Sequence, residues 1–308
     1  MTLHRALAFH ILTLLYLVSA TYDAYAQQPE FIKTAFPKGT IIHSNIRYAD
    51  DASDKHLLDL YLPPQTTVPA ALLVWIHGGA WREQDKYGDM SYMKNLLRTI
   101  LEKGYALASI DYRNSTTAKF PAQIQDCNRA LSFLADHAGA YSLDTAKIVL
   151  IGFSAGGHIA SLLGLSNNNP VPEFYFNAQK PSFTIKAVLD FYGPSNFIMF
   201  YNSGDPKASN DPVSVLLGAS PLKRPDLATL ASPVTYVDRN DPPVFIVHGE
   251  NDTVVPIQQS IVLQSYLDLA HVKNEFTIVK GAPHFGEPFD NPELRAKLFA
   301  FLASCFNH

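Results

Sequence analysis

The feature that most constrains this chain is a serine in a glycine-bounded turn at residues 152–156, which read Gly-Phe-Ser-Ala-Gly. An apolar run over 148–151 precedes the turn, and small and apolar residues over 156–163 follow it. The first run is typical of a buried strand and the second of a helix. This order predicts a strand, a sharp turn and a helix, with Ser154 at the apex. Glycines are expected on both sides because a Cβ there would collide with the neighbouring strand and helix.

Strand-like and helix-like segments alternate through the rest of the chain, which predicts an α/β fold with a mostly parallel central sheet flanked by helices. With 308 residues and 47% hydrophobic composition, the chain can form a sizeable core as one domain. The expected strands cover residues 41–48, 56–62, 71–76, 105–112, 148–153, 185–192, 244–248 and 275–279, the first two as a hairpin. The expected helices cover residues 91–103, 258–270 and 292–306, and one more opens at Pro121.

Two segments interrupt this alternation. Residues 166–182 are rich in Asn and Pro, residues 194–233 are rich in Pro, Ser and Asp, and both contain aromatic side chains. Ligands bind beyond the carboxyl ends of the strands in open α/β sheets. We expect both insertions on that side, as walls of a binding site or a partial lid, with plain surface loops as the alternative.

The first 26 residues are predicted to be a signal peptide. Arg5 gives a positive start, residues 6–20 are mostly apolar, and a small-residue cleavage pattern ends at Ala26. The apolar run is shorter than the roughly 20 residues that a membrane span needs, which disfavours an uncleaved anchor and stable membrane insertion. We therefore expect an exported protein, periplasmic or secreted, in which residues 27–308 form a single domain.

Charge and cysteine content argue against several classes of protein. The chain has 24 basic and 28 acidic residues, a net charge of −4, and no basic stripe that would suit nucleic acid. Two cysteines, Cys127 and Cys305, are too few for a disulfide scaffold, and no spacing predicts a metal site. We expect two separately buried thiols, with a bond between them in an oxidising compartment as the alternative. The oligomeric state is left open.

A serine hydroxyl is a poor nucleophile unless a general base removes its proton and a carboxylate orients that base. Asp252 follows the 244–248 strand in a turn that Pro256 closes, and His284 follows the last strand on a loop. The order Ser, Asp, His is the one expected on such a sheet. We therefore predict that Ser154, Asp252 and His284 meet at one edge of the sheet.

Other acids and histidines compete for these roles. Glu250 and Asp190 are alternative acids, the first two residues before Asp252 and the second at the end of a strand. His248 is interpreted as a packed neighbour at a strand end. His158, on the helix after Ser154, is either a core histidine bonded to backbone or a residue that lines the substrate pocket.

Residues 77–81, His-Gly-Gly-Ala-Trp, directly follow a buried strand and suit an anion site. Backbone N–H groups there stabilise the oxyanion of acyl transfer, and glycines let the backbone approach closely. The amides of Gly78 and Gly79, with that of Ala155, are the predicted donors. His77 is expected to lock the loop. Trp81 either lines the pocket or packs under the loop.

With these parts in place, the chain resembles the α/β-hydrolase superfamily across residues 41–306. The 77–81 loop and the residues after Ser154 are similar to the hormone-sensitive-lipase-like branch. Within it, the chain most resembles exported bacterial bifunctional feruloyl and acetyl-xylan esterases, the BD-FAE type. The stretches that carry the resemblance are residues 58–63, 77–81, 111–113, 120–127, 152–158, 190–194, 231–233 and 248–256.

The resemblance implies hydrolysis of carboxylic esters by Ser154, Asp252 and His284, without a metal or organic cofactor. It implies small-molecule or oligosaccharide esters as substrates, and the acyl group, acetyl or feruloyl, stays open. Many members have a third glycine where this chain has Ala80, which implies a tighter acyl side. The His-Gly-Gly-x-Trp form also occurs in arylformamidases. An arylformamidase or general small-molecule esterase is therefore one alternative, and a carbohydrate-binding protein on an inactive hydrolase scaffold is another.

Overall fold

The computed structural model describes residues 28–64, 68–169, 171–177, 183–203 and 211–306. The chain divides into two compact units, Met1–Thr34 and Ala35–His308. The described part of the first unit contains most of helix α2 (Glu30–Ala35), where Lys33 pairs with Glu30 at 2.7 Å. The predicted signal peptide, residues 1–26, lies outside the described residues.

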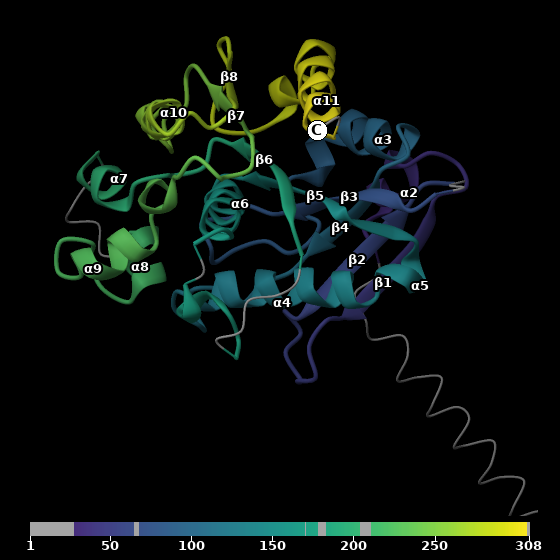
Figure 1. Ribbon diagram of the computed structural model, residues 1–308, viewed down its shortest axis with the longest axis horizontal. Coiled ribbons are helices and arrows are strands. Elements are labelled where there is room, and N and C mark those ends of the chain that lie inside the picture. Colours follow the sequence, from purple (N-terminus) through teal and green to yellow (C-terminus); the bar gives the residue numbers. More distant parts are fainter. Residues whose placement is uncertain (1–27, 65–67, 170, 178–182, 204–210, 307–308) are drawn as a thin grey trace, which may run out of the picture. The chain divides into compact units, whose positions relative to one another are not determined.

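The second unit is built on an eight-stranded sheet with the order β1-β2-β4-β3-β5-β6-β7-β8 (Figure 1). The β1–β2 and β2–β4 pairs are antiparallel, and the other neighbours are parallel. The predicted hairpin and the mostly parallel sheet are therefore both present. The strands are β1 (Ile41–Arg47), β2 (Leu57–Leu62), β3 (Ala70–Ile76), β4 (Ala106–Ile110), β5 (Leu143–Phe153), β6 (Ile185–Phe191), β7 (Val244–Gly249) and β8 (Asn274–Val279).

The parallel strands end together at one edge of the sheet. Ile76 of β3 is paired with Gly152 of β5, and Gly152 with Asp190 of β6. At the far side, Gly249 of β7 is paired with Val279 of β8. The loops that follow these strands therefore leave the sheet side by side, although they are far apart in the sequence.

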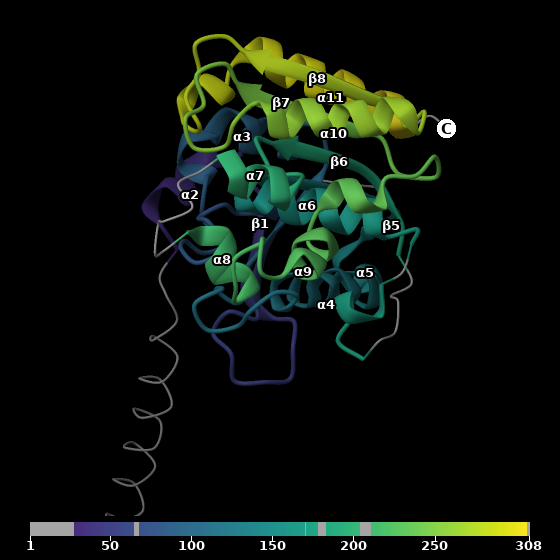
Figure 2. The same ribbon diagram turned by 90° about the vertical axis from the view of Figure 1, so that its left-hand side faces the viewer.

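Helices cover both faces of the sheet (Figures 1 and 2). On one face lie α4 (Ala122–Asp136), α6 (Ala155–Ser166) and α10 (Gln258–Leu269), whose apolar side chains form one cluster with alternate strand residues. On the other lie α3 (Lys94–Glu102) and α11 (Pro292–Phe306), where Phe301 packs on Phe245 with 5.3 Å between ring centroids. Successive strand residues face the two layers in turn because side chains alternate along a strand.

Most predicted elements are present, several boundaries shift by one or two residues, and two elements differ more. The predicted helix over 91–103 is interrupted at Met93: a 3₁₀ turn, η1 (Met90–Tyr92), comes before α3. Strand β5 begins at Leu143, five residues before the predicted start, because its first residues pair with β3 ahead of a register shift. Asp144, Thr145 and Lys147 make this extension look unlike a buried strand in the sequence. Helix α5 (Ala138–Tyr141) lies just before it, and η4 (Glu287–Phe289) precedes α11.

The expected position of insertion 166–182 is wrong. Helix α6 starts at the carboxyl end of β5 and runs back along the sheet, so the insertion leads into the amino end of β6. Accordingly, Asn168 donates to the carbonyl of Asn240, shortly before β7 begins. The insertion includes the 3₁₀ turn η2 (Pro172–Phe174). This correction follows from the helix, which reverses the chain between the two strands.

Insertion 194–233 follows the carboxyl end of β6, as predicted. Its described residues form short helices that lie beyond that edge in Figure 1. Its first helix packs against the 77–81 loop, with Phe197 edge-on to Trp81 at 5.4 Å between ring centroids. The elements of this region are α7 (Phe197–Ser203), α8 (Pro212–Leu217), α9 (Pro225–Leu230) and η3 (Pro233–Tyr236).

Candidate active site

Ser154 occupies the predicted apex between β5 and α6. Its backbone has φ 53° and ψ −117°, a strained conformation for a residue with a Cβ. A Cβ built on Gly152 would lie 2.0 Å from the carbonyl oxygen of Gly156, and one built on Gly156 would lie 2.0 Å from that of Ile76. Glycine is therefore required on both sides of the serine, for the steric reason that the sequence indicates.

The three predicted side chains meet at the sheet edge. The Ser154 hydroxyl donates to Nε2 of His284, with 2.8 Å between the heavy atoms. Nδ1 of His284 lies 2.6 Å from Oδ2 of Asp252, so its proton points at the carboxylate. The imidazole is thereby held in the tautomer that leaves Nε2 free to accept the serine proton. Residues from three separate loops form one hydrogen-bonded row.

Asp252 is surrounded by donors. The Val254 and Val255 amides donate to its Oδ1 at 2.8 and 2.9 Å. Burial alone raises the pKa of Asp252, but hydrogen bonds from His248 and His284 outweigh burial and hold the pKa well below its usual range. The carboxylate is therefore ionised at neutral pH and can stabilise a protonated His284.

His248 contributes more than the packing role predicted for it. It is fully buried, and its Nε2 lies 2.8 Å from the carbonyl oxygen of Val255 and 3.2 Å from Oδ2 of Asp252. Its Nδ1 accepts a hydrogen bond from the Ser260 hydroxyl at 2.7 Å. Asp252 is thus held between two histidines. The spacing of four residues between His248 and Asp252, at a strand end, is the sequence signal that could have suggested this contact.

The competing acids bind elsewhere. Glu250 accepts the amide proton of Gly281 at 2.8 Å, which ties down the loop before His284. Asp190 is buried and accepts hydrogen bonds from the Ser161 hydroxyl and, at 2.8 Å, from the Gly193 amide. Both carboxylates therefore have structural partners other than the imidazole of His284.

The 77–81 loop adjoins Ser154, with one correction to the predicted oxyanion donors. The Gly78 amide donates to Oδ2 of Asp89 at 2.7 Å and is therefore occupied. Among the described residues, the amides of Gly79 and Ala155 donate to no protein acceptor. Burial raises the pKa of Asp89, which the bonds from Tyr92 and Gly78 oppose. Asp89 lies eleven residues beyond Gly78, and no local pattern points to it.

His77 holds this loop in place, as predicted. Its ring stacks on Tyr112 with 4.3 Å between centroids, and its Nδ1 donates to the carbonyl of Gly78 at 2.8 Å. The Tyr112 hydroxyl donates to the His77 carbonyl, also at 2.8 Å. Burial lowers the pKa of His77 to about 4, so the ring is neutral near pH 7.

His158 and Trp81 form a closed pair behind Ser154. The Trp81 indole donates to Nδ1 of His158 at 3.1 Å, and Nε2 of His158 donates to the carbonyl of Ala231 at 2.7 Å. His158 is 1% and Trp81 2% exposed. This burial favours the packing alternatives over the pocket-lining roles considered for both residues.

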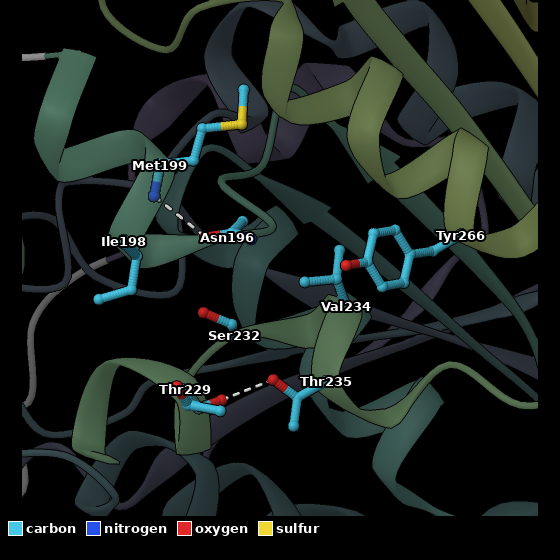
Figure 3. A pocket seen from close by; sticks show the side chains of 8 residues that line it. All are labelled: Asn196, Ile198, Met199, Thr229, Ser232, Val234, Thr235 and Tyr266. Carbon is cyan, nitrogen blue, oxygen red and sulfur yellow. Dashed lines mark hydrogen bonds between the residues drawn. The ribbon is translucent and has the colours of Figure 1, made fainter. Parts of the chain in front are cut away.

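A pocket of about 650 Å³ lies away from the triad (Figure 3). It is uncharged, and the ring of Tyr266 on α10 projects into it from one side. Ser154, Asp252 and His284 do not line it. The residues that do are Asn196, Ile198, Met199, Thr229, Ser232, Val234, Thr235 and Tyr266.

Cys127 and Cys305 are free and buried, as expected. Within the described ranges, no group of three or more His, Cys, Asp or Glu side chains is placed to hold a metal ion. No helix in the described part of the chain is both long and apolar enough to cross a membrane.

Three comparisons relate this chain to known proteins. The family model BD-FAE matches residues 58–267. The probable carboxylic ester hydrolase LipM of Mycobacterium tuberculosis is 31% identical over 254 residues, which cover 80% of this chain and 56% of LipM. The chain thus spans about half the length of this curated relative.

Two solved structures are similar over most of this chain. A truncated carbohydrate esterase from gut microbiota has a TM-score of 0.79 and 30% identity, and the match covers 89% of this chain and 99% of that one. A bifunctional GH43-CE protein of Bacteroides eggerthii has a TM-score of 0.78 and 36% identity, and the match covers 86% of this chain and 35% of that one.

Proposed function

The chain belongs to the BD-FAE family, and we propose that it is a serine carboxylesterase that cleaves acetyl or feruloyl-type esters. The family and the α/β-hydrolase fold were both expected from the sequence, and both are confirmed. The observation that carries the proposal is the row of Ser154, His284 and Asp252, with contacts of 2.8 and 2.6 Å.

The proposed reaction begins with Ser154. Its Oγ attacks the ester carbonyl while Nε2 of His284 takes the hydroxyl proton, and Asp252 stabilises the resulting imidazolium. The tetrahedral oxyanion is held by the amides of Gly79 and Ala155. His284 then gives its proton to the leaving alcohol as the carbon–oxygen bond breaks, which leaves an acyl-enzyme.

Water completes the cycle. His284 removes a proton from the water as its oxygen attacks the acyl carbon, and the second oxyanion occupies the same site. Collapse returns the proton to Ser154 and releases the carboxylic acid. The same residues therefore act twice, and no cofactor is required by this sequence of steps.

The proposed substrates are esters on plant polysaccharides or on their oligomers. The gut carbohydrate esterase supports this class, because that structure matches almost throughout its length. Export, with cleavage near Ala26, is part of the proposal because polymeric substrates lie outside the cell. Amino-terminal sequencing of protein recovered from the periplasm or medium tests it.

Ser154→Ala tests the nucleophile. We expect turnover of nitrophenyl acetate and labelling by a fluorophosphonate probe to be abolished, with an unchanged circular dichroism spectrum. Ser265→Ala is the matched control, because this exposed serine on α10 bonds the Ile261 carbonyl and lies outside the site. Near-native rates in Ser154→Ala would show that the nucleophile is wrong. Folded wild-type protein that takes no label would favour the inactive, carbohydrate-binding alternative.

A substrate panel tests the specificity. Esters with one leaving group and acyl chains from acetyl to hydroxycinnamoyl separate the two acyl classes. Acetylated xylo-oligosaccharides, methyl ferulate and N-formylkynurenine are then compared by kcat/KM. We expect a carbohydrate ester or methyl ferulate to be preferred. A preference for N-formylkynurenine would replace the proposal with the arylformamidase alternative.

A further inference from the structure

Asp89 lies beside the candidate site and belongs to none of the predicted catalytic parts. Its Oδ2 accepts the Gly78 amide proton at 2.7 Å, and its Oδ1 accepts the hydroxyl proton of Tyr92. Its backbone is left-handed, with φ 67°, which Asp tolerates better than most residues. An ionised carboxylate only accepts hydrogen bonds, so it suits two donors that converge from different segments.

The loop that Asp89 holds is strained. Gly79, Ala80 and Trp81 have φ angles of 94°, 52° and 59°, three successive left-handed residues of which two carry a Cβ. Such a turn persists when its surroundings hold it in place. At its far end the Ser115 amide donates to the Trp81 carbonyl at 2.7 Å. Asp89 holds the near end through Gly78.

Asp89 lies near the nucleophile and is linked to the base through two tyrosines. A Cβ built on Gly78 would lie 3.2 Å from Oδ2 of Asp89 and 3.5 Å from Cβ of Ser154, so the carboxylate and the serine flank the same glycine. On the other side, the Tyr92 hydroxyl lies 3.4 Å from that of Tyr192. The buried ring of Tyr192 packs on His284 with 4.8 Å between centroids. One side chain thus connects the anion loop to the residues that support the base.

We propose that Asp89 is a positioning residue: by taking up the Gly78 amide it fixes the 77–81 turn so that the Gly79 N–H, together with that of Ala155, points at the developing oxyanion. This inference rests on the proposed esterase function. It explains why the first glycine amide of the loop is not a donor to the substrate. It also assigns a catalytic consequence to a side chain that does not touch the reacting atoms.

Asp89→Ala is the first test. Loss of one oxyanion donor costs 10²–10³-fold in kcat in other enzymes. We expect kcat for nitrophenyl acetate to fall about 100-fold with KM within about threefold of wild type, because the misplaced amide acts in the transition state. The inhibition constant of a trifluoromethyl ketone, whose adduct carries the oxyanion, should rise by a similar factor.

Asp85→Ala is the matched control. Asp85 is an exposed carboxylate between the 77–81 loop and Asp89, and its Oδ1 accepts the Tyr87 amide at 2.9 Å. We expect wild-type kcat and inhibitor affinity in this variant. A loss equal to that of Asp89→Ala would attribute the effect to general loosening of the loop and overturn the inference.

Asp89→Asn is the second variant, since it keeps the shape of the side chain and one acceptor oxygen for Gly78. We expect kcat and inhibitor affinity to fall three- to tenfold, between wild type and Asp89→Ala. A hundredfold loss of kcat in a folded Asp89→Asn would overturn the inference even where Asp89→Ala does not fold, because Asn keeps an acceptor for the Gly78 amide. So would a folded Asp89→Ala that loses kcat without losing inhibitor affinity. An active Ser154→Ala would instead defeat the esterase function itself, so the two failures are distinguishable.

Discussion

Two histidines flank the Ser154 turn, and their surroundings differ. His284 lies on the loop after β8, is 8% exposed, and presents Nε2 to the serine hydroxyl. His158 lies on α6, is 1% exposed, and has both ring nitrogens bonded, one to Trp81 and one to the Ala231 carbonyl. Burial lowers the pKa of His158 to about 4.

This difference shows what a general base needs beyond its residue type. The base must have one nitrogen facing the proton that it takes, and its charged form must be stabilised. His284 meets both requirements, because Asp252 lies on its other side. His158 meets neither, since its acceptor nitrogen is occupied and no carboxylate among the described residues contacts it. Substitution of His284 should therefore mainly reduce activity, and substitution of His158 should mainly reduce stability.

His284→Ala is expected to have the largest effect on activity. Removal of the base from a serine triad costs up to about 10⁶-fold in kcat in a related mechanism, and we expect a loss of 10⁴–10⁶-fold here. The unfolding free energy should change by only about 1–2 kcal/mol, because Asp252 keeps its contacts with His248 and with the Val254 and Val255 amides. Stopped assays with nitrophenyl acetate and urea titration measure both. A residual rate above one hundredth of wild type would contradict the assignment of the base.

Asp252→Asn is expected to cost slightly less, about 10³–10⁴-fold in kcat, because the amide favours the wrong tautomer of His284. Glu250→Gln is the matched control, since Glu250 is the rival acid two residues away and bonds the Gly281 amide. We expect it to retain kcat within about threefold. A larger loss in Glu250→Gln than in Asp252→Asn would reverse the assignment of the acid.

His158→Leu should lower stability more than activity, the reverse of what we expect for His284→Ala. The substitution leaves the Trp81 indole and the Ala231 carbonyl without partners, at a cost of about 3 kcal/mol in unfolding free energy. We expect kcat to fall no more than about tenfold, through the loosened Trp81 turn. Urea unfolding and steady-state kinetics on one preparation test this. A kcat loss comparable to that of His284→Ala, at unchanged stability, would make His158 catalytic.

The pH dependence of stability reports on the buried histidines rather than on turnover. Burial lowers the pKa values of His77 and His158 to about 4, against about 6.5 in an unfolded chain. Between these values the unfolded state binds more protons, so stability falls as the pH drops from about 6.5 to 4, by up to about 3 kcal/mol per ring. His56 works in the opposite direction: burial opposes its protonation, but bonds with Asp126 and Asp51 raise its pKa.

Urea titrations at several pH values measure this slope. His158→Leu should remove the contribution of His158 to the pH dependence of the unfolding free energy. The slope between pH 6.5 and 4 should then be shallower than in wild type. An unchanged slope in this variant would contradict the buried, neutral state inferred for His158.

Several features could be predicted because they depend on local sterics and on chain order. The turn at Ser154 needs glycines on both sides, and that requirement is written in five consecutive residues. Strands that alternate with helices are parallel and end on the same side of the sheet. Asp252 and His284, which each follow such a strand, are therefore expected to lie close together. The role of His77 in holding the 77–81 loop could also be predicted, because His77 is the first residue of that loop.

Other features could not be read in the sequence because they depend on partners far along the chain. Asp89 captures the Gly78 amide and removes it from the predicted oxyanion donors, and the contact of His248 with Asp252 was missed. The position of residues 166–182 was wrong because the length and direction of α6 decide which edge of the sheet they reach.

The sequence by itself determined the fold class, the family and the three residues that meet at the sheet edge, because each depends on short motifs in a set order. The tertiary structure alone decided which amides stay free, which histidine can accept a proton and which carboxylate holds the anion loop. A backbone N–H makes one strong hydrogen bond, and its acceptor is chosen by proximity in space. That choice is made when the segments pack together.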